Sequence, residues 1–538
     1  MSKRPIFAVL LGLAVMLPPF VRAADEQAPK SDKPAVLLRL APLDHLRGDF
    51  RYLAEVVGQG EKAKQFDELI KSKLGEKGLE GIDNKKPIGL YGWVGEQVID
   101  SKVVVMVPIA DKKAFLDLLS NTLDVKPEKG DDDVYTLNVE RVPFPLYLRF
   151  ANDYAYVTGQ DKEVLNKNKL LAPAAVLPEG QVGTASLTVN VDEIPKDLKE
   201  KALLLLENQL AGVKDKEMPG HTEAQKKFHD AAVDEAGAQL KSLFQHGSAT
   251  TLRLDIDRTA GDLALSLSVA GKPDSPLAKT IRDLGQIQSR TAALLRPDSA
   301  FKSELNVRLP AKLREQMAPA LQDAEKQMLA KAKNDHERAV LKPLLEGIMP
   351  TFEAAELDTA IDLRGPSDKG VYTLVAGIRI KEAAKMEGNF RKTAARFPKQ
   401  INLDVEKSGQ IHIHRINPEK NLKAEAHRQF GDNPAYVAIR GDVLFFGTGE
   451  KGLSALKEAL AAASRMGKVM ELQMALARVA PLFDDPKQAE IARQVFGDNE
   501  DSDRLRVSVE GGKSLTLRLS LKAKLLDFVN RVEKAKKK

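Results

Sequence analysis

The segment His412-Ile-His414 places two histidines two residues apart, and this spacing puts both imidazoles on one face of an extended strand. A three-residue loop, Lys407-Ser-Gly409, would set Asn402 opposite His414 and Asp404 opposite His412. Two imidazoles beside a carboxylate are the beginning of a zinc or copper site. A metal-dependent hydrolase that uses His412 and His414 is therefore one activity that the sequence allows.

Such a site also needs a third protein ligand, which His427 or Glu406 would have to supply. A hairpin explains the two histidines without a metal, because antiparallel strands alternate apolar residues toward the core with polar residues toward water. Ile411 and Ile413 are available to the core in this interpretation. We therefore expect the histidines on the wet face of a hairpin and keep the metal site as the alternative.

The sequence Gly447-Thr-Gly449-Glu-Lys-Gly452 matches the G-x-G-x-x-G pattern of dinucleotide-binding turns. It follows an apolar strand at 443–446 and precedes a helical stretch, as such a site requires. However, that strand is the second arm of a predicted antiparallel hairpin, and the related turn at 158–162 has one glycine of the three. The sequence favours a plain strand-to-helix turn here and predicts no cofactor.

Other catalytic patterns are missing from the sequence. It has no cysteine, which excludes disulfides, thiolate nucleophiles and cysteine-ligated metal clusters. Neither a G-x-S-x-G elbow nor a P-loop occurs in it. The sequence thus assigns no catalytic residue.

The elements that position these residues recur along the chain. One unit consists of a strand, a long helical stretch, a β-hairpin and a helix, and its opening strands show apolar residues at every second position. Four copies of this unit begin near residues 36, 186, 305 and 470. The predicted hairpin of the second copy pairs Leu252, Leu254 and Ile256 with the apolar residues from Leu263 to Val269.

A second unit, a tight hairpin followed by a helix, lies between the first and second copies and again between the third and fourth. Its two examples, 145–157 and 434–446, carry Pro, Tyr and Asp at the same offsets. The chain therefore divides into related halves, 31–297 and 298–533, followed by a basic tail, 534–538. Because hairpins dominate, we predict an α+β fold of mainly antiparallel sheets covered by long helices.

The N-terminal residues have the pattern of a secretory signal. Lys3 and Arg4 precede an apolar run at 6–17, and Val21-Arg22-Ala23 resembles a small-residue cleavage site. We assign 1–23 as a signal peptide and expect no membrane span after its cleavage, since no later stretch reaches about 18 apolar residues.

Three positive charges of the net charge of +6 belong to the predicted signal peptide, and aromatic residues make up 5% of the chain. Without a clustered basic face and stacking aromatics, we do not expect nucleic-acid binding.

Three segments resemble large exported bacterial proteins of unknown function: Lys86-Pro-Ile-Gly-Leu-Tyr91, the strand and helix start at 103–115, and 147–157. The resemblance implies an exported location and the same kind of fold, and it implies no catalytic residues. From these observations we expect a non-enzymatic scaffold or binding protein of the periplasm or cell envelope. Its partner would be a protein or another envelope component. A carrier that holds an apolar ligand between helices and sheet is a further alternative.

Overall fold

The computed structural model describes residues 33–536, apart from 75–78, 98–99, 124, 131, 140–141, 160, 215–221, 333–334, 419–423, 484 and 498–501. The predicted signal peptide and the last two residues of the predicted basic tail lie outside the described residues. The chain forms two compact units. The first contains residues up to Leu203, His246–Lys272 and the residues from Lys522, and the second contains Leu204–Gln245 and Pro273–Leu521.

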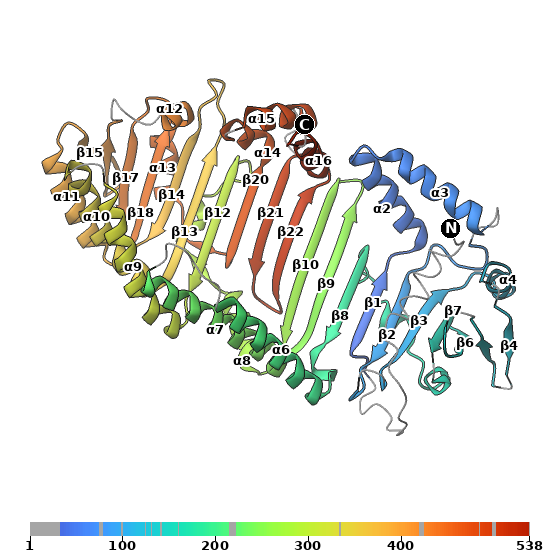
Figure 1. The fold of residues 1–538 in the computed structure, drawn as a ribbon. Coiled ribbons are helices and arrows are strands. Elements are labelled where there is room, and N and C mark those ends of the chain that lie inside the picture. Colours follow the sequence, from blue (N-terminus) through green and yellow to red (C-terminus); the bar gives the residue numbers. More distant parts are fainter. Residues whose placement is uncertain are drawn as a thin grey trace. The chain divides into compact units, whose positions relative to one another are not determined.

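The first unit is built on an antiparallel sheet (Figure 1). Its strands lie in the order β4 (Pro127–Lys129), β5 (Val134–Leu137), β6 (Leu146–Ala151), β7 (Tyr154–Gly159), β3 (Lys102–Pro108), β2 (Ile88–Trp93), β1 (Val36–Leu40), β8 (Ala185–Asn190), β9 (Gly247–Asp257) and β10 (Asp262–Gly271).

The second unit has a sheet of the same kind. Its strands lie in the order β15 (Ile401–Ser408), β16 (Ile411–Ile416), β17 (Ala435–Arg440), β18 (Val443–Gly449), β14 (Thr373–Arg379), β13 (Glu356–Arg364), β12 (Phe301–Arg308), β20 (Met470–Ala475), β21 (Arg504–Glu510) and β22 (Leu515–Lys522).

The two sheets have one and the same topology. In each, the opening strand (β1 or β12) pairs with the next opening strand (β8 or β20) on one side and with its own hairpin on the other. The second hairpin of the half then joins the outer arm of the first. The strand order thus repeats along the chain, and the predicted α+β fold with antiparallel sheets is confirmed. The division into related halves, 31–297 and 298–533, stays a prediction. The predicted pairing of Leu252, Leu254 and Ile256 with the apolar residues from Leu263 to Val269 is also confirmed, and in it Leu252 lies opposite Leu267 and Leu254 opposite Leu265.

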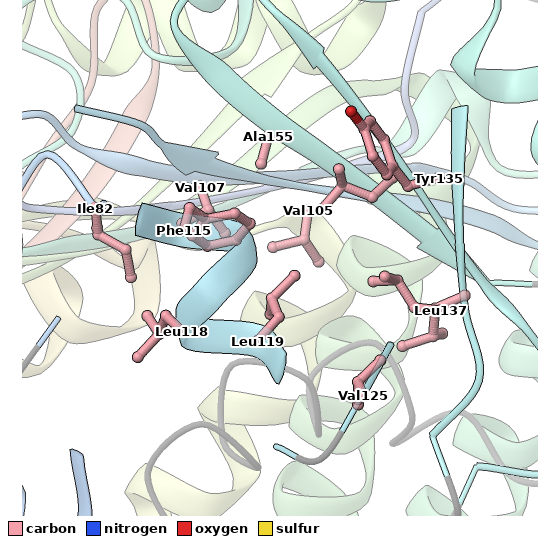
Figure 2. Packing of buried hydrophobic residues seen from close by; sticks show 12 residues of the cluster. Ile82, Val105, Val107, Phe115, Leu118, Leu119, Val125, Tyr135, Leu137 and Ala155 are labelled. Atoms are coloured by element: carbon pink, nitrogen blue, oxygen red, sulfur yellow. The ribbon is translucent and has the colours of Figure 1, made fainter. Parts of the chain in front are cut away.

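The core of the first unit lies between helix α4 (Lys112–Leu123) and one face of the sheet. Figure 2 shows Phe115, Leu118 and Leu119 of this helix beside Val105 and Val107 of β3. Phe115 is 1% exposed, and burying an aromatic side chain of that size stabilises a fold by about 2 kcal/mol. Helix α4 thereby fixes one end of the sheet.

Helices cover both faces of the second sheet at its β14–β18 end. Helix α13 (Gly452–Ala461) packs Ala455 and Leu456 against Val375 and Phe445 on one face. Helix α11 (Ala383–Arg396) packs Phe390 on the other face, against Val437 among others. The strands that carry the predicted histidines are therefore covered on the face that α11 occupies.

Two helices belong to a different compact unit from the hairpin that precedes them in the chain. Helix α8 (Pro276–Leu284) follows β10 but lies in the second unit, where the Gly512 backbone N–H donates to the Ile281 carbonyl over 2.9 Å. Helix α16 (Lys524–Lys536) follows β22 but lies in the first unit, beside α2 (Leu43–Val56). There Asn530 Nδ2 donates to the Val57 carbonyl over 3.2 Å. The last helix of each half thus completes the other unit.

Candidate functional site

The predicted register of the histidine hairpin is wrong. Asn402 lies opposite Arg415, Lys407 lies opposite His412, and the pairing is interrupted between Asn402 and Glu406. Ser408 pairs with Ile411, so the loop is Gly409-Gln410 and not the predicted three residues. The cause is a bulge around Asp404, whose φ of 53° is left-handed.

The bulge nevertheless brings Asp404 to both histidines. Asp404 Oδ1 lies 3.0 Å from His412 Nδ1 and 3.5 Å from His414 Nδ1, although the His412 contact lacks hydrogen-bond alignment. Both histidines were expected on the solvent-exposed side of the hairpin, and only His412 lies there. His414 is 1% exposed and stacks on Phe390 of α11, with ring centroids 5.3 Å apart. Helix α11 covers this face, which is why the alternation rule failed.

Both ring nitrogens of His414 have partners. Nδ1 accepts the backbone N–H of Asp404 over 3.0 Å, and Nε2 lies 3.3 Å from Glu387 Oε1. These two contacts specify a neutral imidazole that carries its proton on Nε2. Burial lowers the pKa of His414, against the opposing effect of the Glu387 carboxylate. His414 therefore acts as a neutral structural link between β15, β16 and α11.

A guanidinium already neutralises the carboxylates of this cluster. Arg391 donates to both oxygens of Asp404, over 2.9 and 3.0 Å, and its Nε donates to Glu387 Oε1 over 2.7 Å. These hydrogen bonds hold the pKa of Asp404 below its usual value. Because one cation occupies the position between the carboxylates, a second cation there would be repelled. The cluster has the chemistry of an ion-pair network.

The two residues considered as a third metal ligand have other partners. Glu406 forms an ion pair with Lys457 at 3.3 Å, and His427 lies 3.5 Å from Asp432. Within the described part of the chain, no group of three or more His, Asp or Glu side chains is placed to hold a metal ion. Metal binding at His412 and His414 stays a prediction.

The glycine turn is packed against the chain's own backbone. Strand β18 is antiparallel to β14 and to β17, whereas a dinucleotide fold has parallel strands here. A Cβ atom at Gly449 would lie 2.0 Å from the Tyr372 carbonyl, and one at Gly447 would lie 2.6 Å from that of Gly452. The glycines are needed for this close approach, so the turn has a structural explanation.

The first unit exposes a face of leucines that the sequence analysis had assigned only to hairpin packing. Leu187, Leu252 and Leu267 form one row across β8, β9 and β10, and Leu254 and Leu265 form the next. We call these five residues the leucine face. Their exposed fractions are 38, 43, 39, 36 and 43% in that order.

The opposite side of the same strands is polar and buried. Ser186 and Thr188 are 2% and 9% exposed. Arg39 donates from Nε to the Val176 carbonyl over 2.6 Å and from Nη1 to Thr188 over 2.9 Å, and Arg253 donates to the Gly180 carbonyl. A connecting segment, 176–182, thus covers the polar side and satisfies it with hydrogen bonds. The leucine face lies on the other, apolar side of these strands, where each leucine keeps about two-fifths of its surface exposed.

A cleft of about 420 Å³ lies in the second unit, at the ends of β12, β13 and β14. Its arginines all have carboxylate partners: Arg290 and Arg379 share Asp442 at 2.5 and 2.8 Å, and Arg308 lies 3.1 Å from Glu356. Each arginine that lines the cleft is therefore already paired with a carboxylate, and exposed ion pairs of this kind contribute little to stability.

Comparison of the chain with protein-family models, with curated proteins and with solved structures finds no match. No helix in the described residues is long and apolar enough to cross a membrane. Function therefore has to be argued from the surface of the molecule itself.

Sequence reasoning located the leucines but missed their exposure. Alternation of Leu252 and Leu254 with Arg253 and Asp255 predicts one apolar side and one polar side. It does not say which side other segments cover. Here the polar side is covered, and no feature of the strand sequences themselves reports this.

Proposed function

We propose that the protein is an exported, non-enzymatic scaffold or binding protein of the periplasm or cell envelope, and that it holds its partner on the leucine face. The observation that carries this proposal is the exposure of five leucines in register on three neighbouring strands. Contiguous apolar patches of this kind on a protein surface are usually interaction sites. The signal-like N-terminus supports the exported location.

A carrier of apolar ligands is favoured by the same face. The carrier and the scaffold differ in what covers the leucines, a small molecule or a macromolecule. Both require that apolar probes bind there from water, which is the common point to test first.

The test uses the neutral dye Nile red with the mature chain. Leu252→Ser/Leu265→Ser should lose most of the wild-type fluorescence enhancement, because it removes two apolar side chains from the centre of the face. Leu204→Ser/Leu205→Ser on helix α6 (Lys196–Lys214) is the matched control, since these leucines are 60% and 66% exposed and lie outside the face. Equal signals from the wild type and both variants would reject the leucine face as the binding surface. Cell fractionation and the mass of the mature N-terminus test the export.

A further inference from the structure

The cleft of about 420 Å³ in the second unit is lined by two groups of residues that are distant in the sequence. The first group comes from neighbouring strands: Arg308 of β12 lies opposite Glu356 of β13, and Arg379 ends β14. The second is the segment from Thr280 in α8 to Arg290. A cleft of about 300–1,000 Å³ is the usual size of a small-molecule site.

A smaller hollow of about 110 Å³ adjoins the cleft, since Glu356 and Arg379 line both. Lys381, two residues after β14, lines the hollow and not the cleft, whereas Asp283 in α8 lines the cleft and not the hollow. Within the described part of the chain, neither Lys381 nor Asp283 forms an ion pair. One basic and one acidic side chain are thus displaced from each other along one opening.

The part of the opening that includes the hollow has an excess of positive charge. Arg290 and Arg379 share the single carboxylate of Asp442, at 2.5 and 2.8 Å, and Lys381 adds a third cation. The carboxylate of Asp358 is 5% exposed and already accepts hydrogen bonds from two hydroxyl groups and a backbone N–H. Three cations therefore face two carboxylates here.

The part of the opening that α8 lines is negative. Asp283 lies in the last turn of α8, where the helix dipole adds to its negative charge. Leu284 and Ile287 line the cleft close to it in the chain, and Val307 and Leu357 of the strands are apolar as well. The opening thus combines a negative part, a positive part and an apolar lining.

We propose that this opening binds a small zwitterion with an apolar side chain, an amino acid or a dipeptide, with its ammonium group at Asp283 and its carboxylate at Arg379 and Lys381. Arg379 keeps its Nε hydrogen bond to Asp442 and donates from its Nη atoms to the ligand. Four cations and four carboxylates line the cleft and the hollow together, which suits a ligand without net charge. The site lies in the second unit and does not depend on the leucine face of the first.

The experiment is isothermal titration of the mature protein with leucine and with leucyl-leucine, each beside its N-acetyl and its amide derivative. The tighter of the two parent ligands identifies the size of the natural one. Each derivative lacks one of the two charges and should bind at least about tenfold more weakly than its parent.

Two variants assign the charges of the ligand to residues. Asp283→Asn should weaken the parent ligand by about fivefold and leave the N-acetyl derivative unchanged, because that derivative has no ammonium group. Lys381→Gln should weaken the parent and the N-acetyl derivative by about fivefold and leave the amide unchanged. Asp368→Asn and Lys487→Gln, which remove exposed charges of the second unit outside the opening, are the matched controls and should bind as the wild type does.

A steric variant tests the place of binding without removing a charge. Thr280→Trp puts a large side chain into the cleft and should weaken every ligand by more than about tenfold, while circular dichroism confirms that it is folded. The inference is overturned if neither parent ligand binds, if parents and derivatives bind alike, or if the control variants lose as much affinity as Asp283→Asn and Lys381→Gln. Loss of binding in Leu252→Ser/Leu265→Ser would place the ligand on the leucine face and overturn it as well.

Discussion

The backbone N–H of Asp404 donates to Nδ1 of His414 over 3.0 Å, and this contact holds a bulge of the edge strand β15 against a buried imidazole. The bond requires that Nδ1 carry no proton. Protonation of His414 would place two N–H groups face to face. The bulge therefore depends on the neutral state of one histidine.

The free energy of unfolding should therefore decrease as the pH is lowered. Burial lowers the pKa of His414 in the folded state. The imidazole of His414 therefore binds a proton near pH 6.5 in the unfolded chain but stays neutral at this pH in the folded chain. The free energy of unfolding is thus at its full value above pH 6.5 and decreases as the pH falls toward the folded pKa. Urea unfolding at a series of pH values measures the slope. His414→Asn, whose side-chain oxygen can still accept the Asp404 N–H, should lose it; an unchanged slope would contradict this account.

Removal of Arg391 should affect the histidine as well as the stability. Arg391→Gln leaves Glu387 and Asp404 without their common cation. In the wild type the charge of Arg391 lowers the pKa of His414, so this pKa should rise in the variant. Solvent screens this partly exposed network, so we expect a loss of no more than about 1 kcal/mol. NMR titration of His414 measures the pKa. Lys385→Gln on the same helix removes only the ion pair to Glu382 and should leave that titration unchanged.

Gly449→Ala should be strongly destabilising, by about 2–3 kcal/mol. The residue has a φ of 92°, and its new Cβ would lie 2.0 Å from the Tyr372 carbonyl. Gly388→Ala is the contrast, because this helical glycine has open space around it and alanine should stabilise the helix by about 0.5–1 kcal/mol. Thermal unfolding compares both with the wild type. Tolerance of alanine at 449 would show that the close approach in this turn relaxes cheaply.

Metal analysis separates the hydrolase alternative from the ion-pair network. We expect no stoichiometric zinc or copper in the mature protein, because Arg391 already occupies the carboxylates beside the histidines. The measurement is elemental mass spectrometry on the wild type and on His412→Ala/His414→Ala. One bound metal per chain that disappears in this variant would support the hydrolase and contradict our assignment.

Much of the architecture could be predicted because it depends on local patterns. Alternating leucines and tight turns are enough to place β9 opposite β10 and to assign the α+β class. The histidine cluster is a part of the structure that local sequence patterns do not predict. A bulge at Asp404 shifts the pairing, and Arg391 reaches the cluster from a helix that precedes β15 in the chain. Neither follows from the period of a strand, because both arise when distant segments pack together.

The crossed assignment of α8 and α16 also constrains the order in which the first compact unit can be assembled during synthesis. The first compact unit takes its α16 from a segment that begins at Lys524, after every strand of the second sheet. A chain that emerges N-terminus first from a ribosome can form the strands of that unit early but cannot complete the unit until α16 has emerged. Until then the surface of α2 that meets α16 stays exposed to solvent. The first unit therefore stays incomplete until every strand of the second sheet has been made.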